Sequence, residues 1–312
     1  MLRASTLRGF VIPGMGEKLV TNLFADDTTA YLSEGDDFDT LLTVLQRWCL
    51  ASRARFNIPK TFVLPIGTAR YRQNVISSRR VGPSPAMIPA NVAIVPDGTA
   101  IRLLGAWLGN KTDQDAIWSP TIEKVSRALN IWLSHGPSLK GKSLVSKFIL
   151  GGMTQYLTKV QGMPLTAEKR LEAALKRFVW GATCKTPPIG KDWLFCPWRE
   201  GGISLLNLKA RNRAIEVTWL RTYLSPPEAR PPWTLVANAM IARDLPQPWS
   251  RVPADARINT FLQSWKPRKN RPHTIPACLI RMLRVAESLH IAILANNISP
   301  HVKRQLPAWY HL

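Results

Sequence analysis

Short apolar segments separated by turns dominate the first third of the chain. Residues 18–32 predict two strands, because apolar residues flank a polar tip at positions 25–27. Residues 61–66 and 101–109 predict further short strands, the second of them interrupted by a tight turn. Between these segments, apolar residues recur at helical spacing over 36–55 and predict a helix. This part of the chain is therefore expected to mix strands and helices.

Two features of this region concern packing. Asp36 and Asp37 lie at the start of the expected helix, where their side chains can cap its first turn. Residues 67–100 contain four prolines and read as a long exposed insertion. We also expect the tryptophans at helical spacing along the chain to lie in the core rather than to form exposed stacking platforms: Trp48, Trp132, Trp180 and Trp219.

Beyond residue 110 the pattern becomes helical. Four apolar stripes at helical spacing predict helices around residues 122–132, 144–149, 171–179 and 214–220. Pro226-Pro227 is expected to end the last of these. Residues 226–275 are rich in Pro, Arg and Trp and read as a linker, whereas 276–296 predict one more amphipathic helix.

The charge of the chain is strongly uneven. Its 42 Lys and Arg residues exceed its 20 Asp and Glu residues, which gives a net charge of +22. Residues 1–40 hold seven acids and three bases, a net charge of −4, so the other 272 residues carry +26. An acidic segment joined to a long basic body indicates a polyanionic partner, and nucleic acid is the most common one.

The expected turn at 25–27 is also the candidate site of chemistry. It carries two adjacent carboxylates, Asp26 and Asp27, at an exposed edge. Carboxylate oxygens are ligands that Mg²⁺ accepts, and paired ions support phosphoryl or nucleotidyl transfer. Asp is also common in turns for conformational reasons alone. The neighbouring motifs must therefore decide between a catalytic and a conformational role for the pair.

Three motifs in series supply those surroundings. FADDTTAYL (24–32) is followed by FNIPKT (56–61) and then by LLGAWLG (103–109). This order resembles the palm of non-LTR (LINE-type) retrotransposon reverse transcriptases. The resemblance implies an α+β fold in three segments: a partial polymerase palm over 1–110, a mainly α-helical thumb-like region over 111–230, and a basic Pro/Arg/Trp-rich linker with a C-terminal helix over 231–312.

The resemblance also implies roles for individual residues. Asp26 matches the first aspartate of the family's hairpin, a ligand of the catalytic Mg²⁺ ions, and Asp27 matches the less strictly required second. Lys60 matches the lysine that approaches the phosphates of the incoming nucleotide. Gly105 matches the turn of a strand that lies near the primer, although an ordinary turn also favours glycine.

Three lysines fall in the segment that the resemblance places beside the template–primer duplex. They lie within GPSLKGKSLVSKF and are Lys140, Lys142 and Lys147. Contact with phosphates and a merely solvated helix face both remain open for them. The stretch GPSLKGKS also fits a phosphate-binding loop literally, but it follows a helical stripe rather than a strand, so we do not expect nucleotide binding there.

The chain departs from the family pattern in one important respect. A working polymerase of this type needs a further palm aspartate and a fingers region before the hairpin, and only Glu17 precedes Asp26 as an acid. The chain therefore resembles an N-terminally truncated fragment of an RNA-directed DNA polymerase. We expect it to bind Mg²⁺ weakly and to be inactive alone, because one carboxylate pair cannot orient an attacking hydroxyl.

The expected partners are an RNA template and a DNA primer, with no small-molecule substrate beyond the deoxynucleotide. No apolar run is long enough to predict a membrane span, and no leader is evident, so an intracellular location in nucleus or cytoplasm is expected. Two alternatives stay open. In the first alternative, the chain is a noncatalytic nucleic-acid-binding protein. In the second, it is a degenerate relic whose incomplete palm leaves a sheet edge unpaired.

Overall fold

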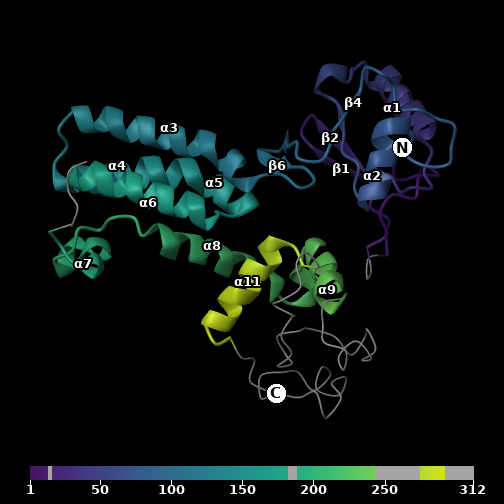
Figure 1. The fold of residues 1–312 in the computed structure, drawn as a ribbon. Coiled ribbons are helices and arrows are strands. Elements are labelled where there is room, and N and C mark those ends of the chain that lie inside the picture. Colours follow the sequence, from purple (N-terminus) through teal and green to yellow (C-terminus); the bar gives the residue numbers. More distant parts are fainter. Residues whose placement is uncertain (13–15, 182–187, 244–274, 292–312) are drawn as a thin grey trace, which may run out of the picture. The chain divides into compact units, whose positions relative to one another are not determined.

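The computed structural model describes residues 1–12, 16–181, 188–243 and 275–291 (Figure 1). The chain divides into two compact units, Met1–Lys124 and Val125–Leu312. The first combines helices with short strands, and the second is helical in its described parts. The expected mixed α+β class is therefore confirmed, while the palm and thumb remain predictions.

Short elements build the first unit. Two hairpins and one parallel pair form three separate two-stranded sheets. The helices are α1 (Phe38–Ser52), the 3₁₀ turn η1 (Ile58–Lys60) and α2 (Ala69–Ser78). The strands are β1 (Thr21–Phe24) with β2 (Asp27–Ala30), β3 (Phe62–Val63) with β4 (Ala93–Ile94), and β5 (Ile101–Leu103) with β6 (Ala106–Leu108).

These elements confirm the hairpin, helix and strand expected before residue 67. The strand expected over 101–109 is present as two short strands that pair across its tight turn. A hydrophobic core in the first unit lies against α1 and α2 and consists of Leu7, Val20, Phe38, Leu41, Val75, Val81, Ala86, Ile88 and Val92. Asp37 caps α1, because its carboxylate accepts a hydrogen bond from the backbone N–H of Thr40 at 3.1 Å.

The expectation of an exposed insertion over 67–100 is wrong. This segment contains α2 and supplies five of the nine buried residues of that core. Arg79 explains how the proline-rich loop after α2 stays ordered. Its guanidinium donates hydrogen bonds to the carbonyls of Ile88, Pro89 and Val92, which satisfies backbone acceptors that a buried loop would otherwise leave unpaired.

Helices follow in the second unit. The helix α3 (Gln114–Ser134) contains the boundary between the units. After it come α4 (Leu139–Ser146), the π-helical turn η2 (Lys147–Gly151), α5 (Gly152–Gln161), α6 (Leu165–Trp180), α7 (Lys191–Phe195) and the 3₁₀ turn η3 (Trp198–Glu200). The described part closes with α8 (Leu208–Tyr223), η4 (Pro227–Ala229), α9 (Trp233–Arg243) and α11 (Ala277–Ser288).

The helix α8 connects two packed groups of the second unit. It contacts α5 and α6 as well as α11. A buried cluster holds α8, α9 and α11 together: Leu220, Tyr223, Ala237, Ile241, Ile275, Leu279, Met282 and Ala286. The linker expected over 226–275 is thus partly wrong, because α9 forms within it; residues 244–274 of that segment lie outside the described residues.

The burial of the tryptophans also differs from expectation. Trp48 is 42% exposed and Trp132 is 44% exposed, so neither is a core residue. Trp219 does pack against the cluster around α8, as expected. Among the described helices, none combines the length and the apolar character that crossing a bilayer requires.

Candidate functional site

The two aspartates lie at the tip of the β1–β2 hairpin. Phe24 pairs with Asp27 across the strands, so Ala25 and Asp26 form a two-residue turn and Asp27 begins β2. The expected position of the tip is confirmed. Ala25 adopts a left-handed conformation with φ of 52°, which reverses the chain within these two residues.

The hairpin projects from the core. Val20 and Thr21 are buried at its base, whereas every residue from Asn22 to Thr28 is exposed. Phe24, beside the aspartates, is 65% exposed. Two carboxylates and one aromatic ring are therefore presented together to solvent at one end of the hairpin.

The arrangement falls short of a complete metal centre. In the described residues, no group of three or more His, Cys, Asp or Glu side chains lies close enough to hold an ion. β1 and β2 pair only with each other in the described sheets, so no neighbouring strand brings another acid beside them. The carboxylates are suitable donors for Mg²⁺, but two adjacent ones do not fix two ions.

Lys60 and Gly105 lie in other elements. Lys60 ends η1 with an exposed side chain, and no hydrogen bond or ion pair of the described residues joins it to either aspartate. Gly105 occupies the β5–β6 turn with φ of 81°, and the preceding Leu104 has φ of 47°. Two successive positive φ values are typical of a type I′ hairpin turn, which explains the glycine by backbone geometry alone.

The three lysines of the α4 segment have different environments. Lys142 donates a hydrogen bond from Nζ to the carbonyl of Val179 at 2.8 Å, so it satisfies a backbone group at the end of α6. Lys140 is exposed in the first turn of α4, and Lys147 is exposed at the start of the π-helical turn. Two of the three are thus accessible to a phosphate.

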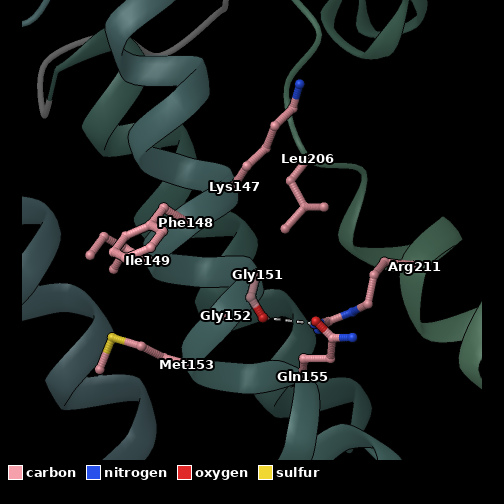
Figure 2. A pocket seen from close by; sticks show the side chains of 9 residues that line it. All are labelled: Lys147, Phe148, Ile149, Gly151, Gly152, Met153, Gln155, Leu206 and Arg211. Carbon is pink, nitrogen blue, oxygen red and sulfur yellow. Dashed lines mark hydrogen bonds between the residues drawn. The ribbon is translucent and has the colours of Figure 1, made fainter.

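Lys147 borders an open groove of about 620 Å³ (Figure 2). One side of the groove follows the π-helical turn into α5, and the other comes from Leu206 and from Arg211 on α8. Phe148, next to Lys147, is 79% exposed. A π-helical turn contains one more residue than an α-helical one, which changes the direction of the side chains that follow it.

Arg211 supplies a second cation at this groove. Its guanidinium donates hydrogen bonds to the hydroxyl of Thr154 at 2.9 Å, and to the carbonyl of Gly151 at 3.3 Å. Burial lowers the pKa of Arg211, while the charge of Glu168 acts in the opposite direction. Because an arginine stays protonated even so, Arg211 adds a positive charge to the groove, which the charge of Glu168 partly offsets.

Sequence reasoning did not identify Arg211 or the groove. An isolated arginine in a helix has no pattern that indicates burial, and a π-helical turn has no sequence signature among these residues. One signal for close helix packing was available in the sequence, because small side chains allow helices to approach each other. The small residues concerned are buried in the structure: Ser143, Ser146, Thr154 and Thr158.

Comparison of the chain with known protein families and with curated proteins finds no match. The class that the fold defines is a mixed α+β protein in two compact units. Its candidate sites are an exposed carboxylate hairpin in the first unit and a largely apolar groove in the second, which Lys147 and Arg211 border.

Proposed function

We propose that this chain is part of an RNA-directed DNA polymerase of the non-LTR retrotransposon type, and that it binds template and primer without catalysing nucleotidyl transfer by itself. The observation that carries the proposal is the β1–β2 hairpin, with Asp26 and Asp27 exposed at a two-residue turn beside Phe24. The motifs after it, FNIPKT and LLGAWLG, supply the family resemblance. Such a protein acts where RNA and DNA ends occur, in the nucleus or the cytoplasm.

The charge of the remaining chain supports nucleic acid as the ligand. Lys140, Lys147 and Arg211 place cations along the α4–α5 segment and the adjoining groove. Phosphate contacts made by such residues give affinity without sequence preference. In the proposed role, the second unit contributes affinity and the hairpin contributes carboxylates for Mg²⁺.

The incomplete carboxylate set is the reason to propose binding without turnover. Two-metal transfer needs ligands that hold both ions in line with the attacking and leaving oxygens. The described residues offer Asp26 and Asp27 alone at the hairpin. The only chemistry that we assign to these residues is coordination of a single, weakly held Mg²⁺.

A Mg²⁺-linkage experiment tests this proposal. Affinity for a labelled RNA template annealed to a DNA primer is measured by fluorescence anisotropy, with and without Mg²⁺ at constant ionic strength. We expect Mg²⁺ to improve binding by the parent chain, because it neutralises the carboxylates near the phosphates. The Asp26→Asn, Asp27→Asn double variant should bind more tightly without Mg²⁺ and lose this improvement.

Glu172→Gln is the matched control, because Glu172 is exposed on α6, away from the hairpin in sequence and in the other unit. It removes one negative charge and should keep the Mg²⁺ response of the parent. An identical response in the parent and the double variant would contradict the assigned role of the hairpin. Primer extension by the parent that disappears in Asp26→Asn would contradict the absence of turnover.

A second candidate function is noncatalytic nucleic-acid binding with no role for the aspartates. The groove with its exposed Phe148 favours it, because that groove needs no metal. Binding that depends on Lys147 and Arg211 and is unaffected by the double hairpin variant would favour this function over the first.

A further inference from the structure

The C-terminal end of α1 carries an aromatic pair at the surface. The ring centroids of Trp48 and Phe56 are 5.4 Å apart, with an angle of 38° between the ring planes. The chain folds back to make this contact. The Ser52 hydroxyl donates to the carbonyl of Trp48 at 2.7 Å and accepts from the backbone N–H of Ala54 at 3.2 Å. Arg53, with φ of 59°, ends the helix.

Trp48 lies outside the part of α1 that packs against the core. The buried residues of α1 are Phe38 and Leu41, in its first turn, and Leu45 packs partly against the same core. Trp48 lies beyond them, 42% exposed, and Phe56 covers only part of its ring. A large aromatic surface is therefore available to a ligand at this end of the helix.

Three arginines lie close to the pair along the chain. Arg47 precedes Trp48, and Arg55 precedes Phe56, so both are adjacent along the chain to one of the two rings. The side chains of Arg47, Arg53 and Arg55 are exposed. No Asp or Glu occurs anywhere from residue 40 to residue 96, a stretch with eight cations. We call Arg47, Trp48, Arg53, Arg55 and Phe56 the α1 patch.

We propose that the α1 patch is a binding site for single-stranded nucleic acid, in which an unpaired base stacks on Trp48 and flanking phosphates contact the arginines. This deepens the proposed function and rests on it, because it names the strand state of the ligand and the residues that bind it. Cations beside an aromatic platform are the features by which proteins bind single strands without sequence preference.

The single strand is favoured over a duplex for a geometric reason. The faces of paired bases are covered by their neighbours in the stack, whereas an unpaired base has a free face that an aromatic ring can cover. Charge alone would serve a duplex, an acidic protein or an anionic membrane equally well. A duplex leaves the exposed ring pair unused, and the flanking arginines favour a phosphate-bearing strand as the ligand of the rings.

Binding of the full chain to a labelled oligo(dT) and to a blunt-ended RNA–DNA duplex tests the proposal. We expect Trp48→Ala to weaken oligo(dT) binding by roughly 5- to 150-fold, the range for loss of one stacking platform. Trp48→Phe should restore most of the affinity, because it keeps a ring. Duplex binding should change much less in both variants.

Trp132→Ala is the matched control, since Trp132 has nearly the same exposure and lies in the other unit. Arg55→Glu provides a second test that leaves the rings in place. It should weaken oligo(dT) binding and reduce the slope of log K against log salt by about 0.7 or more, the share of one phosphate contact on a single strand. Inorganic polyphosphate, which has no bases, should bind Trp48→Ala as well as the parent.

Unchanged oligo(dT) affinity in a folded Trp48→Ala chain would overturn the α1 patch and leave the proposed function standing if the duplex is still bound. Equal losses for oligo(dT) and polyphosphate would also overturn it, since charge would then explain the binding. A parent chain that binds neither oligo(dT) nor the duplex would overturn both proposals together.

Discussion

At the scale of single residues, Asp36 shows how one carboxylate fixes a local fold. Its side chain is 4% exposed and accepts hydrogen bonds from the backbone N–H groups of Arg8 at 2.6 Å, Gly9 at 2.9 Å and Ser33 at 2.8 Å. Burial alone raises its pKa, but these hydrogen bonds outweigh burial and lower it. The ionised form therefore holds the N-terminal segment against the turn before α1.

The depressed pKa predicts acid sensitivity. A carboxyl whose pKa is lower in the folded than in the unfolded chain stabilises the fold above its ordinary value of about 3.9, and this contribution disappears as the pH falls through the folded pKa. We expect Asp36→Asn to destabilise the first unit by roughly 2 kcal/mol at pH 7. The free energy of unfolding of the Asp36→Asn variant should also fall less steeply below pH 5 than that of the parent.

Urea unfolding at pH 7, 5, 4 and 3 measures both effects. Asp39→Asn is the control, because Asp39 is exposed in the next turn of the chain and accepts no comparable set of backbone hydrogen bonds through its side chain. Parallel pH profiles for the parent and Asp36→Asn would contradict the assigned role of this carboxylate.

At the scale of elements, Gly162 allows the end of α5 to lie close to the Arg281 side chain of α11. Gly162 ends α5 with φ of 75°, and a Cβ atom there would lie 2.0 Å from Nη2 of Arg281. Arg281 in turn donates from Nε to the buried carboxylate of Glu216 at 2.8 Å. The absence of a side chain at Gly162 therefore allows the ion pair that links α11 to α8.

Gly162→Ala is expected to destabilise the second unit by roughly 1–3 kcal/mol, because the positive-φ backbone at this position is strained for any residue with a Cβ atom and the Arg281 guanidinium must shift. Gly152→Ala is the matched control: Gly152 has helical φ and nothing within 4 Å of its added Cβ atom. That substitution should instead stabilise α5 by about 0.5–1 kcal/mol. Thermal unfolding of the two variants distinguishes these outcomes, and equal shifts would contradict the close approach.

At the scale of the whole molecule, charge separates along the chain. The acidic segment that includes the hairpin carries −4, and the residues after position 40 carry +26. The three lysines of the α4 segment differ in availability, because Lys142 is engaged at the end of α6. Affinity for nucleic acid is therefore expected to come from many weak phosphate contacts distributed over the basic body.

Such binding predicts a steep dependence on salt. Four phosphate contacts would give a slope of about −3.6 in log K against log salt on duplex DNA, or about a hundredfold loss between 50 and 200 mM salt. Anisotropy titrations across this range measure the slope. An uncharged peptide nucleic acid of the same sequence is the control and should not bind; a slope near zero would contradict nucleic acid as a charge-recognised partner.

The elements with the strongest local signals were predictable from sequence. The β1–β2 hairpin, α1 and the β5–β6 turn follow from apolar spacing and turn residues within a few positions. The helix α2 was missed because the prolines after residue 80 dominate the pattern of its segment. The sequence also gave no reason to separate Trp48 from core tryptophans, since its spacing within α1 matches that of the buried residues.

The sequence by itself determined the charge asymmetry, the adjacent carboxylates at a turn and the change from mixed to helical structure, because each depends on composition or on neighbours along the chain. Only the tertiary structure decided that Asp36 is a buried clamp, that Lys142 is engaged, that Arg211 borders a groove and that Trp48 meets Phe56 at the surface. These properties depend on residues brought together by chain reversals and helix packing, and spacing along the sequence does not encode which side chains meet there.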